Sequence, residues 1–315
     1  MNIPWVEKYR PKIFSEIVGN KHIISRFEII AKGGNLPNLI ICGSSGTGKT
    51  ISVDVLARSL LGDCYRDAVL EISASDYRGV EFVRNTVKTF AKKKLTLPPG
   101  IHKIIIIEEA ESIPNEAQQV LRRIMEFYSG TTRFIFSCNT SAKIIEPIQS
   151  RCAIVRFSNL DGDSIRERIL HICKKECVNY TKDGIDAIVF TSDGDMRNAI
   201  GNIQSTYTGM GVVTHDNVFR LCDIPKPEVV LGILENCVKK KFVVSMLAVK
   251  SMNKEGHSSQ DITNTFFKVC KNRLDVEEST RMKFLKEIAF THSRVTNGLI
   301  SSIQLVGMCS RLCDV

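Results

Sequence analysis

The sequence has no long apolar stretch, which excludes the simplest kind of membrane protein. None of its hydrophobic runs approaches the roughly 20 residues that a membrane-spanning helix needs. The opening, Met1 to Trp5, also lacks the apolar core of a signal peptide. We therefore expect an intracellular protein with no membrane partner.

The cysteines lack the spacing of a disulfide or zinc framework. There are 11 of them, an odd number, scattered mostly within apolar segments, which does not suit a secreted scaffold. Cys173 and Cys177, with His171 nearby, and Cys309 and Cys313 have i,i+4 spacing, so zinc must be considered. Neither pair has C-x-x-C spacing with a matching second half. Most cysteines are expected to be small core residues, and no metal site is predicted from them.

Basic residues outnumber acidic ones, which gives a net charge of +9. Such a surplus favours a polyanionic partner, although it can also serve solubility alone. Arg84, Lys88 and Lys92 recur every four residues in a helix predicted over residues 80–94, so they form one stripe. These three residues are candidate DNA contacts, and the alternative is an ordinary solvated face.

Residues 43–50 match the pattern G-x-x-x-x-G-K-[ST] of loops that wrap nucleotide phosphates. An apolar run at residues 39–42 precedes the loop, as a buried parallel strand would, and apolar residues at helical spacing follow it. The glycines allow backbone N–H groups to turn toward the phosphates. Lys49 is expected to reach the β- and γ-phosphates, and the Thr50 hydroxyl to bind Mg²⁺. The sequence therefore predicts a nucleoside triphosphate site.

Polar residues follow two of the predicted strands. Glu108, Glu109 and Glu111 come directly after an apolar strand at residues 103–107. Carboxylates at the end of a central strand beside a phosphate loop hold Mg²⁺ and the attacking water. Asn139 ends another strand and is expected near the γ-phosphate, although asparagine often only caps a turn.

The pattern of the chain changes after residue 158. Before it, apolar runs alternate with helical patterns, which predicts a parallel sheet covered on both faces. Ahead of these runs, residues 5–11 are predicted to be an irregular segment that either packs on the core or walls an adenine pocket. The predicted strands are residues 39–42, 69–73, 103–107, 133–139 and 153–157.

Beyond residue 158 the apolar residues recur with periods near 3.6, which predicts helices only. Arg197 begins the third helix of a small bundle, where it can reach a neighbouring site or form a local ion pair. Pro225 and Pro227 mark a linker. The last predicted helices span residues 258–273, 277–290 and 298–312. The predicted domains are an α/β nucleotide-binding domain over residues 1–158, a helical domain over 159–224 and a helical oligomerisation domain over 225–315.

The motifs of this sequence resemble those of the small subunits of replication factor C, the AAA+ sliding-clamp loader, in the same order. The similarity spans nearly the whole chain, and it is greatest to the small subunits numbered two in vertebrates and four in fungi. The motifs that carry it are residues 5–11, 43–50, 73–76, 108–111, 150–152 and 194–197.

The resemblance implies a P-loop AAA+ core, a helical lid and a helical collar, with ATP and Mg²⁺ bound in the core. Glu109 would deprotonate the attacking water, while Thr50 and Glu108 would bind Mg²⁺. Arg151 would be the arginine finger that completes the ATP site of the adjacent subunit. The implied ATP-binding residues are Val6, Arg10, Val18, Gly43, Ser44, Ser45, Gly46, Thr47, Gly48, Lys49, Thr50, Ile51, Asn139 and Arg197.

The resemblance also implies partners and a location. They are the other subunits of a hetero-pentameric clamp loader, the sliding clamp and primer–template DNA, all in the nucleus. Hydrolysis would occur mainly in the assembled complex.

One residue departs from the family pattern, because Glu108 stands where the family usually has Asp. The additional methylene moves the carboxylate by roughly 1.3–1.5 Å, enough to disturb the geometry around Mg²⁺. One alternative is therefore a structural subunit that binds nucleotide, hydrolyses it poorly and donates Arg151. Another alternative is a branch-migration type of AAA+ helicase.

Overall fold

The computed structural model describes residues 3–75, 81, 83–98, 100–272 and 275–315. The chain forms two compact units, Met1–Val213 and Thr214–Val315. The predicted α/β domain and most of the predicted lid fall in the first unit. The division lies after Val213, whereas the sequence placed its second boundary after residue 224. The three-part division stays a proposal.

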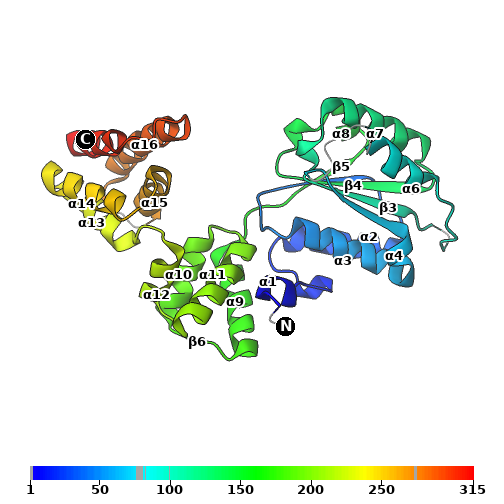
Figure 1. The fold of residues 1–315 in the computed structure, drawn as a ribbon, viewed down its shortest axis with the longest axis horizontal. Helices are drawn as coiled ribbons and strands as arrows, with labels where there is room; N and C mark the ends of the chain where they lie inside the picture. The colour runs from blue at the N-terminus through cyan, green and yellow to red at the C-terminus, as the bar shows by residue number, and fades with distance from the viewer. Residues whose placement is uncertain (1–2, 76–80, 82, 99, 273–274) are drawn as a thin grey trace. The chain divides into compact units, whose positions relative to one another are not determined.

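A sheet of parallel strands forms the centre of the first unit (Figure 1), which confirms the predicted fold class. The strand order is β2-β3-β4-β1-β5, so β1 lies between β4 and β5. Cys42 at the end of β1 is directly opposite Cys138 at the end of β4. The phosphate loop and Asn139 therefore leave the sheet side by side. The strands are β1 Leu39–Cys42, β2 Val69–Ser73, β3 Lys103–Glu108, β4 Thr132–Cys138 and β5 Ala153–Arg156.

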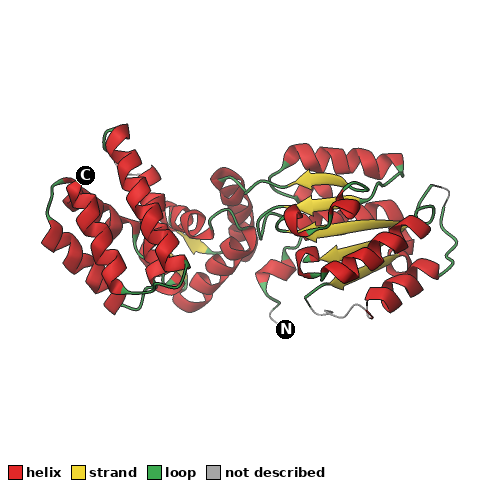
Figure 2. Ribbon diagram, turned by 90° about the horizontal axis from the view of Figure 1, so that it is seen from above, coloured by secondary structure: helices red, strands yellow, loops and turns green. Residues whose placement is uncertain are grey.

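Alternate side chains of each strand point to opposite faces of the sheet, and both faces are buried. Leu39 and Ile41 pack with the helices of one face, and Ile40 and Cys42 pack with those of the other. Figure 2 shows helices on both sides of the strands. The first face carries α2 Lys21–Gly33 and α3 Lys49–Leu61, and the second carries α6 Lys88–Lys92, α7 Asn115–Phe127 and α8 Glu146–Gln149.

The helix expected over residues 80–94 is shorter and less regular than predicted. A π-helical turn, Val83–Val87, runs into α6, which ends at Lys92, and residues 80 and 82 lie outside the described residues. The buried side chain of Lys103 closes the end of α6, because its Nζ donates to the carbonyls of Ala91 at 2.5 Å and Lys93 at 2.7 Å.

The expectation of an irregular opening segment is wrong for its first residues. Trp5–Lys8 forms a short helix, α1, immediately after Pro4. Trp5 is buried, its ring lies 6.0 Å from that of Tyr207, and its backbone N–H donates to Gln204 Oε1 at 2.9 Å. Packing against a distant helix thus imposes a turn of helix that the local pattern does not show. A further short helix, α4 Tyr65–Ala68, precedes β2.

Three longer helices complete the first unit. They are accompanied by a two-stranded parallel pair that the sequence analysis did not predict, because two-residue strands carry no periodicity. The side chain of Asp195 caps the third helix by accepting from the N–H groups of Arg197 and Asn198 at 2.7 and 3.2 Å. The elements are α9 Gly162–Glu176, β6 Asn179–Tyr180, α10 Lys182–Ser192, α11 Met196–Met210 and β7 Val212–Val213.

The second unit is helical in its described residues, as predicted. The expected final helix over residues 298–312 is wrong at its start: α16 ends at Thr296, Gly298 has a φ of +97°, and the next helix begins at Ser302. Among the described residues, no helix has both the length and the apolar character to cross a membrane. The helices are α12 His215–Cys222, α13 Pro227–Val238, α14 Phe242–Lys254, α15 Ser259–Asn272, α16 Glu278–Thr296 and α17 Ser302–Asp314.

Candidate functional site

A cavity of about 210 Å³ lies in the first unit, where the carboxyl ends of the strands meet the opening segment and the helices after residue 160. Most of the predicted nucleotide-binding residues line it. Gly43 and Ser44 do not, but their carbonyl groups face Lys49. The predicted residues that line the cavity are Val6, Arg10, Val18, Ser45, Gly46, Thr47, Gly48, Lys49, Thr50, Ile51, Glu108, Glu109, Asn139 and Arg197.

Lys49 is held at the centre of the phosphate loop. Its Nζ donates to the carbonyls of Gly43 at 2.5 Å and Ser44 at 2.7 Å, and to Asn139 Oδ1 at 3.2 Å. Burial lowers the pKa of Lys49 below its ordinary value, and the Glu111 carboxylate opposes this effect. The ammonium group is therefore positioned for an anionic ligand at the start of α3, where a helix dipole also favours negative charge.

Two carboxylates enter the cavity from the end of β3. Glu108 is the last residue of the strand, and Glu109 follows it with a φ of +52°. A non-glycine residue rarely adopts this left-handed conformation, and such conformations concentrate at functional sites. The side chain of Glu109 is exposed, whereas that of Glu108 is half-buried.

The oxygen atoms present suit a magnesium ion. Thr50 carries a hydroxyl and Glu108 a carboxylate, and both residues line the cavity. Mg²⁺ prefers oxygen ligands, and at nucleotide sites it takes one or two from the protein and the rest from phosphates and water.

Arg197 reaches the cavity because α11 begins beside the phosphate loop. The backbone N–H of Met196 donates to the Gly46 carbonyl at 3.2 Å, and a Cβ on Gly46 would lie 1.7 Å from Asp195 Oδ1. The first turn of α11 thus contacts the loop directly. This contact brings the exposed side chain of Arg197 to the cavity, as predicted.

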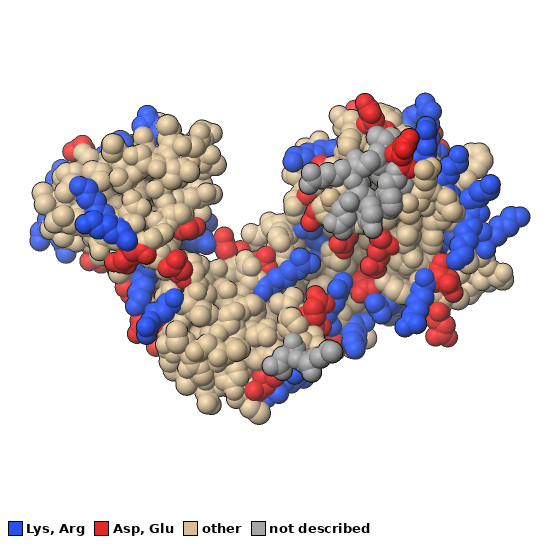
Figure 3. Space-filling view, viewed as in Figure 1, with Lys and Arg blue, Asp and Glu red and all other residues tan. Residues whose placement is uncertain are grey.

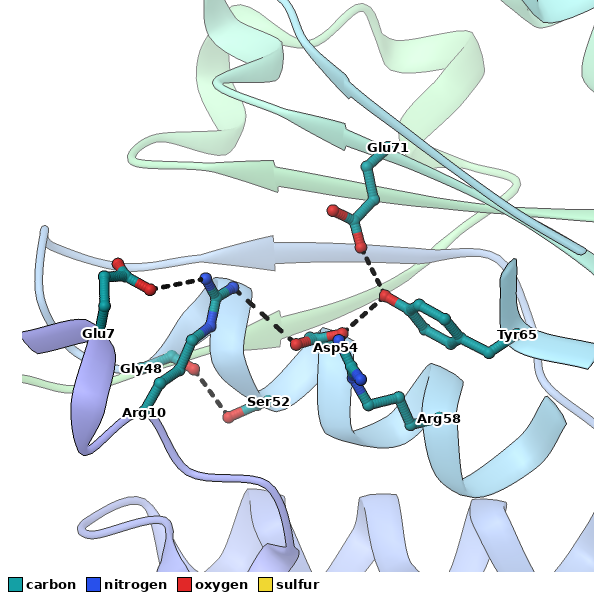
Figure 4. Close-up of polar contacts among 8 residues, drawn as sticks. All are labelled: Glu7, Arg10, Gly48, Ser52, Asp54, Arg58, Tyr65 and Glu71. Carbon is teal, nitrogen blue, oxygen red and sulfur yellow. Dashed lines mark hydrogen bonds and ion pairs between the residues drawn. The ribbon is translucent and has the colours of Figure 1, made fainter. Parts of the chain in front are cut away.

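The opening segment also lines the cavity, with Val6 and Arg10 among its lining residues. Figure 4 shows Arg10 extending from this segment between Glu7 and Asp54, with ion-pair distances of 3.6 and 3.9 Å. Asp54 lies on α3 and also accepts a hydrogen bond from the Tyr65 hydroxyl at 2.6 Å. The segment is therefore joined electrostatically to the helix that carries the phosphate loop.

The same segment is joined to α9 on its other side. Glu176 accepts hydrogen bonds from Tyr9 and, at 2.5 Å, from Lys8 Nζ. Arg168 donates to the Tyr9 carbonyl at 2.8 Å and itself lines the cavity. Burial lowers the pKa of Arg168. These contacts make residues 5–11 a strap between α3 and α9.

Arg151 lies outside the cavity. Its guanidinium forms an ion pair with Glu126 at 2.7 Å and donates to the Pro147 carbonyl at 2.7 Å. The side chain is 40% exposed, which leaves it accessible to another molecule. Arg151 therefore lies apart from the residues that line the cavity, and its role toward an adjacent subunit stays a prediction.

The predicted basic stripe also lies away from the cavity. Arg84 is in the π-helical turn, Lys88 and Lys92 are in α6, and all three are exposed. Figure 3 shows Lys and Arg side chains gathered along the part of the α/β layer that carries α6. The distribution is compatible with DNA contact and with a solvated face, so the role of the stripe stays a prediction.

Glu111 was predicted as one of the acids after β3, but its partner was not, and neither Arg168 in the cavity nor Asp195 beside it was predicted as a site residue. Glu111 accepts two hydrogen bonds from Asn139, although 28 positions separate them in the chain. Arg168 carried no signal, because a single arginine in an amphipathic helix is common. Asp195 was recognisable only as a helix cap.

Two family descriptions match the chain. "ATPase family associated with various cellular activities (AAA)" covers residues 39–160, and "Replication factor C C-terminal domain" covers residues 225–311.

The chain is also similar over nearly its full length to proteins named as replication factor C subunits. The chain is 50% identical to "Replication factor C subunit 2" of Arabidopsis thaliana, over 99% of the chain and 93% of that protein. It is 51% identical to "Replication factor C subunit 4" of Saccharomyces cerevisiae, over 99% of the chain and 96% of that protein.

Similarity to a solved structure supports the fold and nothing beyond the fold. The Thermotoga maritima RuvB Holliday junction branch migration motor matches with a TM-score of 0.56 and 17% identity, over 73% of this chain and 79% of that one. By its AAA match, its full-length similarity to subunits 2 and 4 and its C-terminal domain, this chain belongs to the replication factor C family, among the small subunits.

Proposed function

We propose that this chain binds ATP with Mg²⁺ in the described cavity and hydrolyses it within a clamp loader that places a sliding clamp on primer–template DNA. As a replication factor C subunit, the chain is a clamp-loader ATPase that serves DNA replication. The observation that carries the proposal is the convergence of Lys49, Glu109, Asn139 and Arg197 on one cavity.

Each residue has a distinct part in the proposed reaction. Lys49 and the N–H groups of the loop bind the phosphates, and Arg197 contacts the γ-phosphate. Glu109 accepts a proton from the water that attacks the γ-phosphorus, and Asn139 orients that water. The bond to the β-phosphate oxygen breaks, and ADP and phosphate leave. Bound Mg²⁺, held by Thr50 and Glu108, would neutralise charge on the phosphates.

Arg151 completes the site of the adjacent subunit in this proposal. Its exposure and its place outside the cavity support the assignment. A guanidinium supplied by a neighbour stabilises the charge that develops in the transition state, so hydrolysis depends on correct assembly. DNA contact through phosphates, without base specificity, and residence in the nucleus belong to the same proposal.

The nucleotide site is tested by Lys49→Ala. The ammonium makes charge-assisted hydrogen bonds, each contributing about 1.5–3 kcal/mol, so ATP affinity should fall about 10- to 100-fold. Titration of the purified chain with a fluorescent ATP analogue measures this. Lys32→Ala removes an exposed lysine from α2 and should change nothing. Unchanged affinity in Lys49→Ala would refute the proposed site.

A second candidate function is a structural subunit that binds nucleotide without turning it over. Glu108, in place of the usual Asp, favours it. Glu109→Gln separates the two, because it removes the proposed base without changing the size of the side chain. A large loss of ATPase activity in the assembled complex supports catalysis by this chain. Unchanged activity supports the structural role.

A further inference from the structure

Glu111 contributes a carboxylate to the cavity that the proposed reaction does not yet use. It lies in the turn after β3, two residues beyond Glu109. Its Oε1 accepts from the backbone N–H of Asn139 at 3.1 Å and from Asn139 Nδ2 at 2.7 Å. Its Oε2 is buried and has no hydrogen-bond partner among the described residues. Its contacts are therefore directed at Asn139.

The partners of Asn139 fix the orientation of its amide. Carboxylate oxygens only accept hydrogen bonds and an ammonium only donates them, so the NH₂ group must face Glu111 and Oδ1 must face Lys49. An amide turned over would place like partial charges against both neighbours. An NH₂ group has two N–H donors, and Glu111 accepts from one of them. The second remains for the substrate.

We propose that Glu111 is a positioning residue for ATP hydrolysis, which it controls by holding the Asn139 amide in this orientation. The inference rests on the proposed function. Lys49 keeps the carbonyls of Gly43 and Ser44 as partners whether or not Asn139 is held. Loss of Glu111 should therefore affect the chemical step and spare the binding of ATP.

A double-mutant cycle in the assembled complex tests this role. Glu111→Ala should lower kcat at least 10-fold and change the affinity for ATP less than twofold. In an Asn139→Ala background, Glu111→Ala should lower kcat by less than a further twofold, because nothing is left to position. If the effects of the two substitutions on kcat multiply, the proposal is wrong. It is also wrong if Glu111→Ala leaves kcat unchanged, or if it weakens the affinity for ATP as much as it lowers kcat.

Two more variants test whether a loss of activity comes from the lost hydrogen bonds to Asn139 and not from the removal of any nearby carboxylate. Glu111→Gln retains a carbonyl that can accept both hydrogen bonds, so its kcat should lie nearer to wild type than to Glu111→Ala. A kcat as low as that of Glu111→Ala would contradict positioning. Glu116→Ala removes an exposed carboxylate from the start of α7 and should leave kcat unchanged. Thermal unfolding midpoints confirm that each variant is folded.

The result also separates this inference from the function on which it rests. A wild-type complex that neither binds nor hydrolyses ATP would refute the proposed function. A wild-type complex that hydrolyses ATP, with Glu111 and Asn139 acting independently, would refute the role of Glu111 alone.

Discussion

At the scale of single residues, Gly46 occupies a position where any side chain would force a neighbouring side chain to move. Its φ is +66°, and a Cβ there would overlap the Asp195 carboxylate that caps α11. Gly48 has a similarly left-handed φ of +92° but open space where its Cβ would be. Replacing either glycine therefore costs conformational free energy, but only a side chain at residue 46 would also clash with a neighbour.

We therefore expect Gly46→Ala to destabilise the protein more than Gly48→Ala. Both variants lose about 1 kcal/mol to the left-handed conformation. Gly46→Ala should lose about 1–2 kcal/mol more, because displaced Asp195 no longer caps its helix. Urea unfolding of the two variants measures the difference, and equal losses would contradict the close contact between the loop and α11.

Glu176 makes a pH-dependent contribution to stability. The hydrogen bonds from Lys8 and Tyr9 lower the pKa of this carboxyl below its ordinary value of 4.5. The unfolded chain therefore binds the proton at higher pH than the folded one, so the contribution is complete above about pH 4.5 and is lost as pH falls through the folded pKa.

Glu176→Gln cannot lose a charge at low pH, so its unfolding free energy should fall less than that of wild type as pH is lowered from 5 to 3. Denaturant unfolding across this range provides the test. Parallel pH profiles for the two proteins would show that the strap is not held to α9 by this carboxylate.

At the scale of elements, α6 and the π-helical turn before it present the basic stripe. If Arg84, Lys88 and Lys92 bind DNA phosphates, replacing all three with Ala should reduce the salt dependence of DNA binding. The slope of log K against log salt should fall by roughly 0.9 for each duplex phosphate that the variant no longer neutralises. Fluorescence anisotropy of the complex with labelled primer–template DNA at several salt concentrations measures it.

A matched control uses the exposed lysines at residues 239–241, which carry the same charge in the second unit. Their replacement with Ala should leave the slope nearly unchanged. If both triple variants behave alike, the stripe is a solvated face and overall charge accounts for binding.

Elements were predictable where one strong local pattern decided them. The loop at residues 43–50, with a strand before it and a helix after it, is such a case, as are the isoleucines of β3. Elements that depend on distant partners were not. Trp5 is helical because it packs on Tyr207, and the pair β6-β7 exists because two separate helical connections meet.

In the candidate site, too, residues marked by a local pattern were predictable and contacts between distant residues were not. Lys49 and the acids after β3 are recognisable by residue type and position. The pairing of Glu111 with Asn139 follows from the register of β3 and β4, which residue spacing does not reveal.

At the scale of the whole molecule, the proposed role of Arg151 would make the adjacent subunit dependent on this chain for full activity. Arg151→Ala should leave the affinity of this chain for ATP unchanged. In the assembled complex it should slow hydrolysis at the adjacent subunit at least about 10³-fold, because an arginine finger contributes that much. ATP titration of the isolated variant and single-turnover hydrolysis by the complex provide the measurements.

Removal of Glu126, the ion-pair partner of Arg151, is the informative control. Glu126→Ala leaves the guanidinium in place and should slow the adjacent site far less than Arg151→Ala. A weakened affinity of the Arg151→Ala chain for its own ATP would contradict action on a neighbour.

The backbone hydrogen bond from Met196 to Gly46 has a consequence for nucleotide exchange. Met196 and Arg197, at the start of α11, line the same cavity as the loop, so we expect this hydrogen bond to hold part of the cavity wall against the loop. The residence time of the product should then follow how often the start of α11 lifts away. Release of ADP is then expected to limit turnover together with the chemical step.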